Sequence, residues 1–235
     1  EDVDLTYDIR AIAPDLVGKA AEALPPTPSQ EKKWTKEIRT RLTRWTQDDA
    51  LPTIASAVAE ANLSAKAHAE GDTIYLDYEP LAAGTGYVLP TVRLEFGARA
   101  TGEPWEERAV ACDAAGYLPQ LSFPTATPRV MRIARTFWEK ATAIHVFCLQ
   151  GRFRGADRFA RHWHDVARLG DAGHVAGAIA DREVAGAVAR HKVMFFAEKD
   201  TNGAVIDYAA AVAGGLRLVP DGDALALLAE DYRRM

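Results

Sequence analysis

The chain has 235 residues and a formal net charge of −5, with 48% hydrophobic and 26% charged residues. A chain of this length and composition buries a sizeable core, as one large or two small domains. The acidic balance excludes a global basic field of the kind that drives non-specific nucleic-acid binding. Any RNA contact must therefore come from a local patch.

The cysteine pattern and the hydropathy predict a protein of the reducing cytoplasm. Cys112 and Cys148 are far apart and have neither CxxC nor Cys/His spacing, so they indicate neither a zinc site nor a disulfide framework. No uninterrupted apolar run approaches the roughly 18 residues that span a bilayer. The first residues also lack the basic start and apolar stretch of a signal peptide. We therefore expect a cytoplasmic protein without a membrane partner.

The first part of the chain predicts a strand followed by a helical insertion. Residues 2–5 alternate acidic and apolar, which on a strand places Asp2 and Asp4 on one face. Ala-rich and charged residues then recur at helical spacing over 14–24 and 28–63, and prolines separate these two helices.

A small sheet and then a helical half are predicted further along. Short alternating runs separated by Gly and Pro predict strands that residues 2–5 would join, at 73–79, 91–96, 107–111 and 129–133. Beyond residue 135, helices are expected over 136–150, 155–168, 172–196 with a break, and 223–234. The predicted class is α+β, a small mixed sheet with a helical insertion followed by a mostly helical carboxy-terminal half. The predicted domains are 1–134 and 135–235.

Three carboxylates on the predicted strands are candidates for a metal site. Asp2 and Asp4, at i and i+2 on a strand, converge on one side and can share divalent cations, although a solvated strand edge gives the same pattern. Glu95 lies opposite the apolar face of its predicted strand and would complete a Mg²⁺ site. A surface ion pair with Arg93 or Arg99 is the other interpretation of Glu95. Clustered carboxylates of this kind support two-metal nucleotide chemistry.

Lys140 stands apart from the apolar stripe of the helix predicted over 136–150. Phe137, Ala141, Ile144 and Cys148 form that stripe, which leaves Lys140 on a different face. A lysine there could contact a nucleotide phosphate as a point charge, or it could simply be solvated.

The segment 151–168 mixes arginines with aromatic residues, a combination that suits RNA or nucleotide contacts. Asp165 falls on one helical stripe with its basic residues, so it could orient an arginine or act on a substrate hydroxyl. An internal salt-bridge ladder is the alternative. The candidate RNA-binding or nucleotide-binding arginines are Arg154, Arg158 and Arg161.

Four blocks in this order resemble the successive motifs of AbiEii/AbiGii-type nucleotidyltransferase toxins. They are residues 1–5, 92–99 followed by Glu103-Pro104, 135–145 and 160–166. Segments near 191–196, 215–220 and 231–235 resemble the closing segments of the same family, so the resemblance covers nearly the whole chain.

The resemblance implies a polymerase-β-like nucleotidyltransferase core, nucleotide transfer from an NTP with Mg²⁺ or alternatively Mn²⁺, and an antitoxin partner. It implies a toxin of a toxin–antitoxin or phage-defence system, and an RNA acceptor, with the tRNA 3′ end as acceptor in some members. By motif match, Asp2 and Asp4 would be metal ligands and Glu95 the third acidic group. Lys140 would contact the nucleotide, and Asp165 would be the late essential aspartate, with Arg161 beside it.

The sequence departs from the family at its start. Members carry a glycine-rich turn and a basic stretch just before the Asp-x-Asp strand, which cradle the triphosphate, whereas this chain begins at Glu1. The core would therefore be incomplete, and we expect this chain alone to be inactive and its full-length parent to be an enzyme. Two alternatives stay open: transfer to a protein or small-molecule hydroxyl, and a non-catalytic partner-binding module. The module predicts carboxylates too far apart to share a cation.

Overall fold

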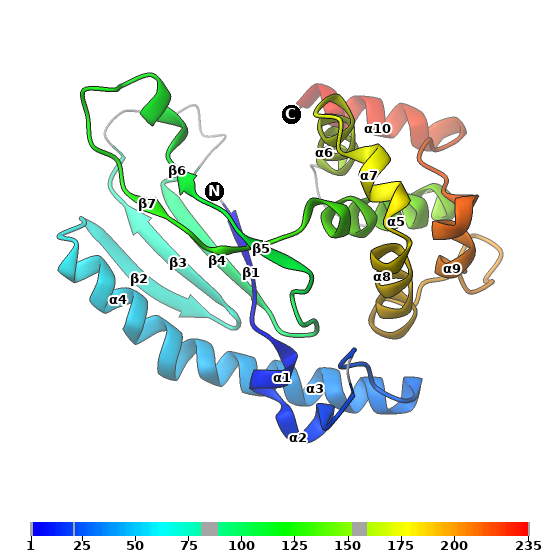
Figure 1. Ribbon diagram of the computed structural model, residues 1–235, viewed down its shortest axis with the longest axis horizontal. Coiled ribbons are helices and arrows are strands. Elements are labelled where there is room, and N and C mark those ends of the chain that lie inside the picture. The colour runs from blue at the N-terminus through cyan, green and yellow to red at the C-terminus, as the bar shows by residue number, and fades with distance from the viewer. Residues whose placement is uncertain (1, 21, 81–88, 152–158, 235) are drawn as a thin grey trace. The chain divides into compact units, whose positions relative to one another are not determined.

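The computed structural model describes residues 2–20, 22–80, 89–151 and 159–234, except the side chain of Asp2 (Figure 1). The chain groups into two compact units, Glu1–Gly102 and Glu103–Met235. The first holds a mixed sheet with its helices, and the second is mostly helical, so the predicted α+β class is confirmed. The predicted domain boundary after residue 134 stays a prediction. None of the described helices is long and apolar enough to cross a membrane.

The sheet of the first unit has four strands in the order β1-β4-β3-β2. Strand β1 runs parallel to β4, whereas β4, β3 and β2 are antiparallel neighbours, which makes the sheet mixed as predicted. The strands are β1 (Asp2–Thr6), β2 (Ala65–Glu70), β3 (Thr73–Tyr78) and β4 (Thr91–Gly97).

Side-chain alternation gives this sheet one apolar and one polar face. Ile74 and Leu94 are register partners in the apolar set, and Ile74 is fully buried. Phe96 belongs to the same set and meets the ring edge of Trp45, with 5.2 Å between centroids. Trp45 ends helix α3 (Pro28–Trp45), so this helix lies against the apolar face and leaves the polar face uncovered by it.

The predicted helical insertion is present, with one correction. The helix expected over 14–24 ends at Val17, because Gly18 takes a positive φ of 57° that stops the helix. The helix expected over 28–63 continues through a π-helical turn and ends at Glu60, and Thr27 caps its start by accepting the Gln30 N–H at 3.3 Å. The remaining elements are α1 (Ile9–Ile12), α2 (Pro14–Val17), η1 (Thr46–Ala50) and α4 (Leu51–Glu60).

Two of the predicted strands do not join the main sheet, contrary to expectation. The later strands are only two or three residues long, too short for an extended ladder with the main sheet, and they pair with each other. They form two separate ladders in the second unit. The ladders join β5 (Trp105–Glu107) to β8 (Arg129–Met131) and β6 (Val110–Ala111) to β7 (Thr125–Ala126), with a short 3₁₀ turn η2 (Asp113–Gly116) between.

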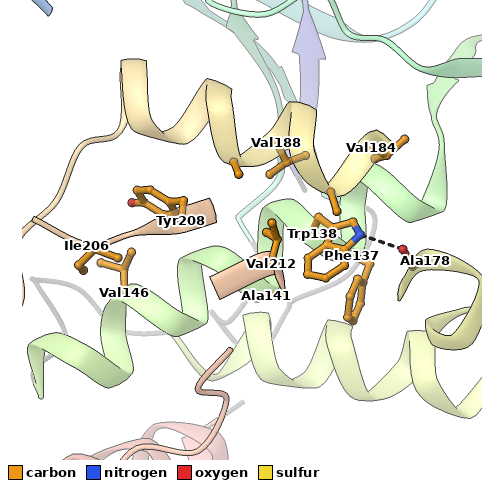
Figure 2. Close-up of a cluster of buried hydrophobic side chains, with 12 residues drawn as sticks. Phe137, Trp138, Ala141, Val146, Ala178, Val184, Val188, Ile206, Tyr208 and Val212 are labelled. Atoms are coloured by element: carbon orange, nitrogen blue, oxygen red, sulfur yellow. Dashed lines mark hydrogen bonds between the residues drawn. The ribbon is translucent and has the colours of Figure 1, made fainter. Parts of the chain in front are cut away.

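The helices of the second unit pack around one apolar cluster, drawn in Figure 2. Val188 and Ala141 at its centre are fully buried, and the Trp138 indole N–H donates to the Ala178 carbonyl at 2.8 Å. The break predicted within 172–196 falls at Asp181, whose carboxylate caps the next helix at the Val184 N–H. The helices are α5 (Ile133–Gln150), α6 (Ala160–Asp171), α7 (Val175–Ala180), α8 (Arg182–Phe195), α9 (Tyr208–Ala210), η3 (Ala211–Gly215) and α10 (Gly222–Arg234).

Candidate active site

The parallel pairing of β1 with β4 aligns two of the predicted carboxylates. Asp4 and Glu95 are direct register partners. Partners on neighbouring strands lie about 4.8 Å apart and project to the same face, so both carboxylates stand on the polar face of the sheet. The Asp4 side chain is exposed, and within the described part of the chain it has no hydrogen-bond or ion-pair partner. It is therefore available to a ligand from solvent.

Glu95 has a charged neighbour on its own strand. The Arg93 guanidinium lies 3.6 Å from the Glu95 carboxylate, and both side chains are partly exposed. The surface ion pair considered from the sequence is thus present. An exposed contact of this length is weak, so it leaves Glu95 able to exchange its partner for a cation.

Asp2 pairs with Arg93 in the strand register, two residues before Asp4. The Asp2 side chain lies outside the described residues, so the described part of the predicted carboxylate trio is Asp4 with Glu95. Among the described residues, no group of three or more His, Cys, Asp or Glu side chains gathers closely enough for a metal ion. Oxygen ligands of the Asp4 and Glu95 type nevertheless fit a hard cation such as Mg²⁺.

In the second unit, the structure brings together Lys140 and Asp165, two residues predicted separately from motifs 25 positions apart. Lys140 on α5 places its ammonium 2.6 Å from the Asp165 carboxylate on α6. The side chains are 30% and 40% exposed, so the pair is open to solvent at one side. The Lys140 face does lie apart from the apolar stripe, because Phe137 and Ala141 are buried beside it.

Two histidines flank this ion pair differently. The pKa of His162 is lowered to about 4, first by burial and then by the positive charges of Lys140 and Arg161. Its Nδ1 atom is buried and has no hydrogen-bond partner among the described residues. His164 is partly exposed and lies 3.8 Å from Asp165. At neutral pH, His162 is therefore uncharged and adds no positive charge to the Lys140 surroundings.

A largely buried charge network that was not predicted from the sequence lies beside Lys140. Glu139 receives the Lys192 ammonium of α8 at 3.1 Å and the Arg135 guanidinium at 3.3 Å. Burial raises the pKa of Glu139, but the charges of Lys192, His191 and Arg135 outweigh it and leave that pKa lowered. A carboxylate directly before Lys140, with Arg135 four residues earlier, was the available signal.

Of the three arginines predicted to bind RNA, the structure describes only Arg161. Arg154 and Arg158 lie outside the described residues. Arg161 is exposed on α6, as an RNA contact would require. Arg168 pairs with Asp171 at 3.6 Å, and among the described residues it does not join Asp165.

A family model described as nucleotidyl transferase AbiEii toxin, type IV toxin–antitoxin system, matches residues 1–235. No curated protein and no solved structure matches the chain. The match covers both the Asp4–Glu95 strand pair and the Lys140–Asp165 helix pair. The chain therefore belongs to the AbiEii nucleotidyltransferase toxin family of type IV toxin–antitoxin systems.

Proposed function

We propose that this protein transfers a nucleotide from an NTP to RNA in a metal-dependent reaction, with the 3′ end of tRNA as the acceptor. Family membership supports the transferase chemistry. The observation that carries the proposal is the parallel register that sets Asp4 beside Glu95 on an open, polar face of the sheet. A toxin of this kind would block translation and serve phage defence until its antitoxin neutralises it.

Asp2, Asp4 and Glu95 are the residues that would hold Mg²⁺, or alternatively Mn²⁺. When bound, the cation lowers the pKa of the attacking hydroxyl and neutralises charge on the triphosphate. Carboxylate oxygens bind such ions at about 2.0–2.6 Å. Neighbouring strand positions about 4.8 Å apart are compatible with two carboxylates sharing one ion.

Lys140 and Asp165 take the second role in the proposal. The Lys140 ammonium contacts a phosphate of the nucleotide, and Asp165 holds that ammonium in position from α6. In the transfer, the acceptor hydroxyl oxygen bonds to the α-phosphorus and the bond from that phosphorus to pyrophosphate breaks. The hydroxyl proton leaves to solvent, so the products are the extended RNA and pyrophosphate.

The test is labelling of RNA by the full-length gene product. We would incubate it with radiolabelled NTPs, Mg²⁺ and total tRNA, beside the variant Asp4→Ala. The matched control is Glu70→Ala, which removes an exposed carboxylate from the far edge strand β2 of the same sheet. We expect label on tRNA that is lost by at least about 100-fold in Asp4→Ala and kept in Glu70→Ala.

The alternatives give different results. If no NTP labels tRNA but a protein or a small molecule is labelled, the acceptor in the proposal is wrong. If nothing is labelled and Asp4→Ala changes no measured property, the chain is a partner-binding module and the enzymatic proposal fails.

A further inference from the structure

Helix α3 is the most basic helix of the described structure, in a chain whose net charge is −5. The helix contains six cationic residues and two carboxylates, Glu31 and Glu37, so its net charge is +4. The rest of the chain therefore sums to −9. The six cations are Lys32, Lys33, Lys36, Arg39, Arg41 and Arg44.

One side of α3 is buried in the first unit and the other is exposed to solvent. Trp34, Ile38 and Leu42 recur at helical spacing and are buried in the first unit. Arg41 joins Asp15 through two contacts of 2.5 and 2.9 Å and also joins Glu37 at 2.8 Å, so its charge is used within the fold. The other side of the helix is turned to solvent.

An open groove of about 600 Å³ follows this solvent side. Lys32, Lys36 and Arg39 line it at i, i+4 and i+7, so they lie along one stripe. At about 1.5 Å per residue this stripe is about 10 Å long, close to the physiological Debye length of about 8 Å, so the three charges act together. The other lining residues are Glu31, Thr35, Thr40 and Thr43.

The charges of this stripe are not neutralised within the fold. Lys32, Lys36 and Arg39 form no ion pair with any other residue that the structure describes. The one carboxylate of the groove, Glu31, accepts the Thr35 hydroxyl at 2.6 Å. Arg99, after strand β4, is near enough that the Arg39 charge, second to burial, lowers its pKa. The positive charge therefore extends from the helix to the end of the sheet.

We propose that the α3 groove is a binding surface for the phosphate backbone of RNA. Lysine, arginine and threonine are the side chains that contact phosphate oxygens in nucleic-acid complexes. Binding energy in protein–protein interfaces is concentrated in Trp, Tyr and Arg anchors in well-packed pockets, whereas this open groove is lined by no aromatic residue and by one arginine, Arg39. RNA thus fits the groove better than an acidic protein does. The inference rests on the proposed function only in taking RNA as the acceptor.

The experiment measures RNA binding by the chain itself, without catalysis. The probe is a short fluorescein-labelled RNA oligonucleotide, and its anisotropy is titrated with the protein over a series of salt concentrations. The test variant is K32Q/K36Q/R39Q. The matched control, K19Q/K66Q/K199Q, removes the same number of charges from exposed lysines that do not line the groove.

We expect the groove variant to bind RNA about tenfold or more weakly at low salt, and the control to bind like the original chain. The slope of log affinity against log salt should fall by about 2, from three contacts at about 0.7 each on single strands. The substituted side chains are exposed, so circular dichroism and thermal unfolding should be unchanged. The single variant K36Q, with a slope lower by about 0.7, provides the same test with less perturbation.

Three outcomes would overturn the proposal. They are an equal loss in both triple variants, unchanged RNA affinity in the groove variant, and stronger competition by poly-glutamate than by unlabelled RNA at equal charge. The last would indicate an acidic protein partner. Groove-dependent RNA binding without any NTP labelling would leave this inference standing while the proposed function fails. RNA labelling with unchanged affinity in the groove variant would do the reverse.

Discussion

At the scale of single residues, the Lys140–Asp165 pair has a geometry better suited to function than to stability. Its partners are 30% and 40% exposed, and partly exposed ion pairs contribute only about 0.2–1 kcal/mol. A second ion pair lies within α6, where Arg168 is 3.6 Å from Asp171 and each of the two side chains is 70% exposed. The two pairs therefore allow a matched comparison.

We predict that Lys140→Gln and Asp165→Asn each lower the free energy of unfolding by less than about 1 kcal/mol, because the pair is solvent-screened. Each should lower RNA labelling by about 100-fold or more, since the ammonium would lose its place on the phosphate. The double variant should be no slower than the slower single one, because residues that act as a unit are not additive. Urea unfolding and labelling rates measure the two quantities.

The control is the pair Arg168→Gln and Asp171→Asn, which should change neither stability nor labelling appreciably. If the two pairs lowered the labelling rate equally, a general electrostatic effect on α6 would explain the loss. Lys140 and Asp165 would then have no special role.

At the scale of elements, the Glu139 network fastens α5 to α8. Glu139 lies between Arg135 of its own helix and Lys192 of α8, and Lys192 also stands 4.6 Å from the ring centre of Phe196. The Lys192 side chain is only 12% exposed. Removing the carboxylate would leave a cation buried without its counter-charge, which is costly.

We predict that Glu139→Gln lowers the free energy of unfolding by about 3 kcal/mol at neutral pH. Glu183→Gln, at the exposed start of α8, should cost only a few tenths of a kcal/mol as a control. Denaturant unfolding with an unchanged m-value measures both. An equal loss of unfolding free energy in the two variants would contradict a stabilising role of the Glu139 network.

The same network predicts a pH dependence. Burial raises the pKa of Glu139, yet the Lys192, His191 and Arg135 charges leave it lowered in the folded state. A depressed folded pKa gives stability that is fully present above the unfolded value of about 4.3 and is lost as pH falls below it. The stability difference between the original chain and Glu139→Gln should therefore shrink as the pH falls below about 4.3 and through the lowered folded pKa of Glu139.

The elements also show what could be predicted from sequence and what could not. Residues 2–5 and 91–96 alternate strongly enough to predict β1 and β4, and the stripe of Phe137 and Ala141 predicts α5. Strand β2 was missed because its sequence, Ala-Lys-Ala-His-Ala-Glu, is poor in β-branched and aromatic residues and depends on pairing with β3. The register of Asp4 with Glu95 and the contact of Lys140 with Asp165 join segments distant in sequence, so no local pattern contains them.

At the scale of the whole molecule, each compact unit has its own hydrophobic core. Ile38 of α3 is 2% exposed in the first unit, and Val188 of α8 is fully buried in the second. Ile38 is not a member of the buried cluster that contains Val188. Their contributions to stability should therefore be independent.

We predict that Ile38→Ala costs about 3 kcal/mol and Val188→Ala about 2 kcal/mol, from lost burial plus the cavity left behind. The double variant should equal the sum within about 0.5 kcal/mol, because Ile38 lies outside the buried cluster that contains Val188. Val184 belongs to the same cluster as Val188, so Val184→Ala combined with Val188→Ala should deviate from additivity.

Calorimetry measures these changes in the free energy of unfolding. If the units unfold separately, Ile38→Ala and Val188→Ala should each shift a different transition. Coupling between Ile38 and Val188 as large as that within the cluster would mean that the two cores act as one.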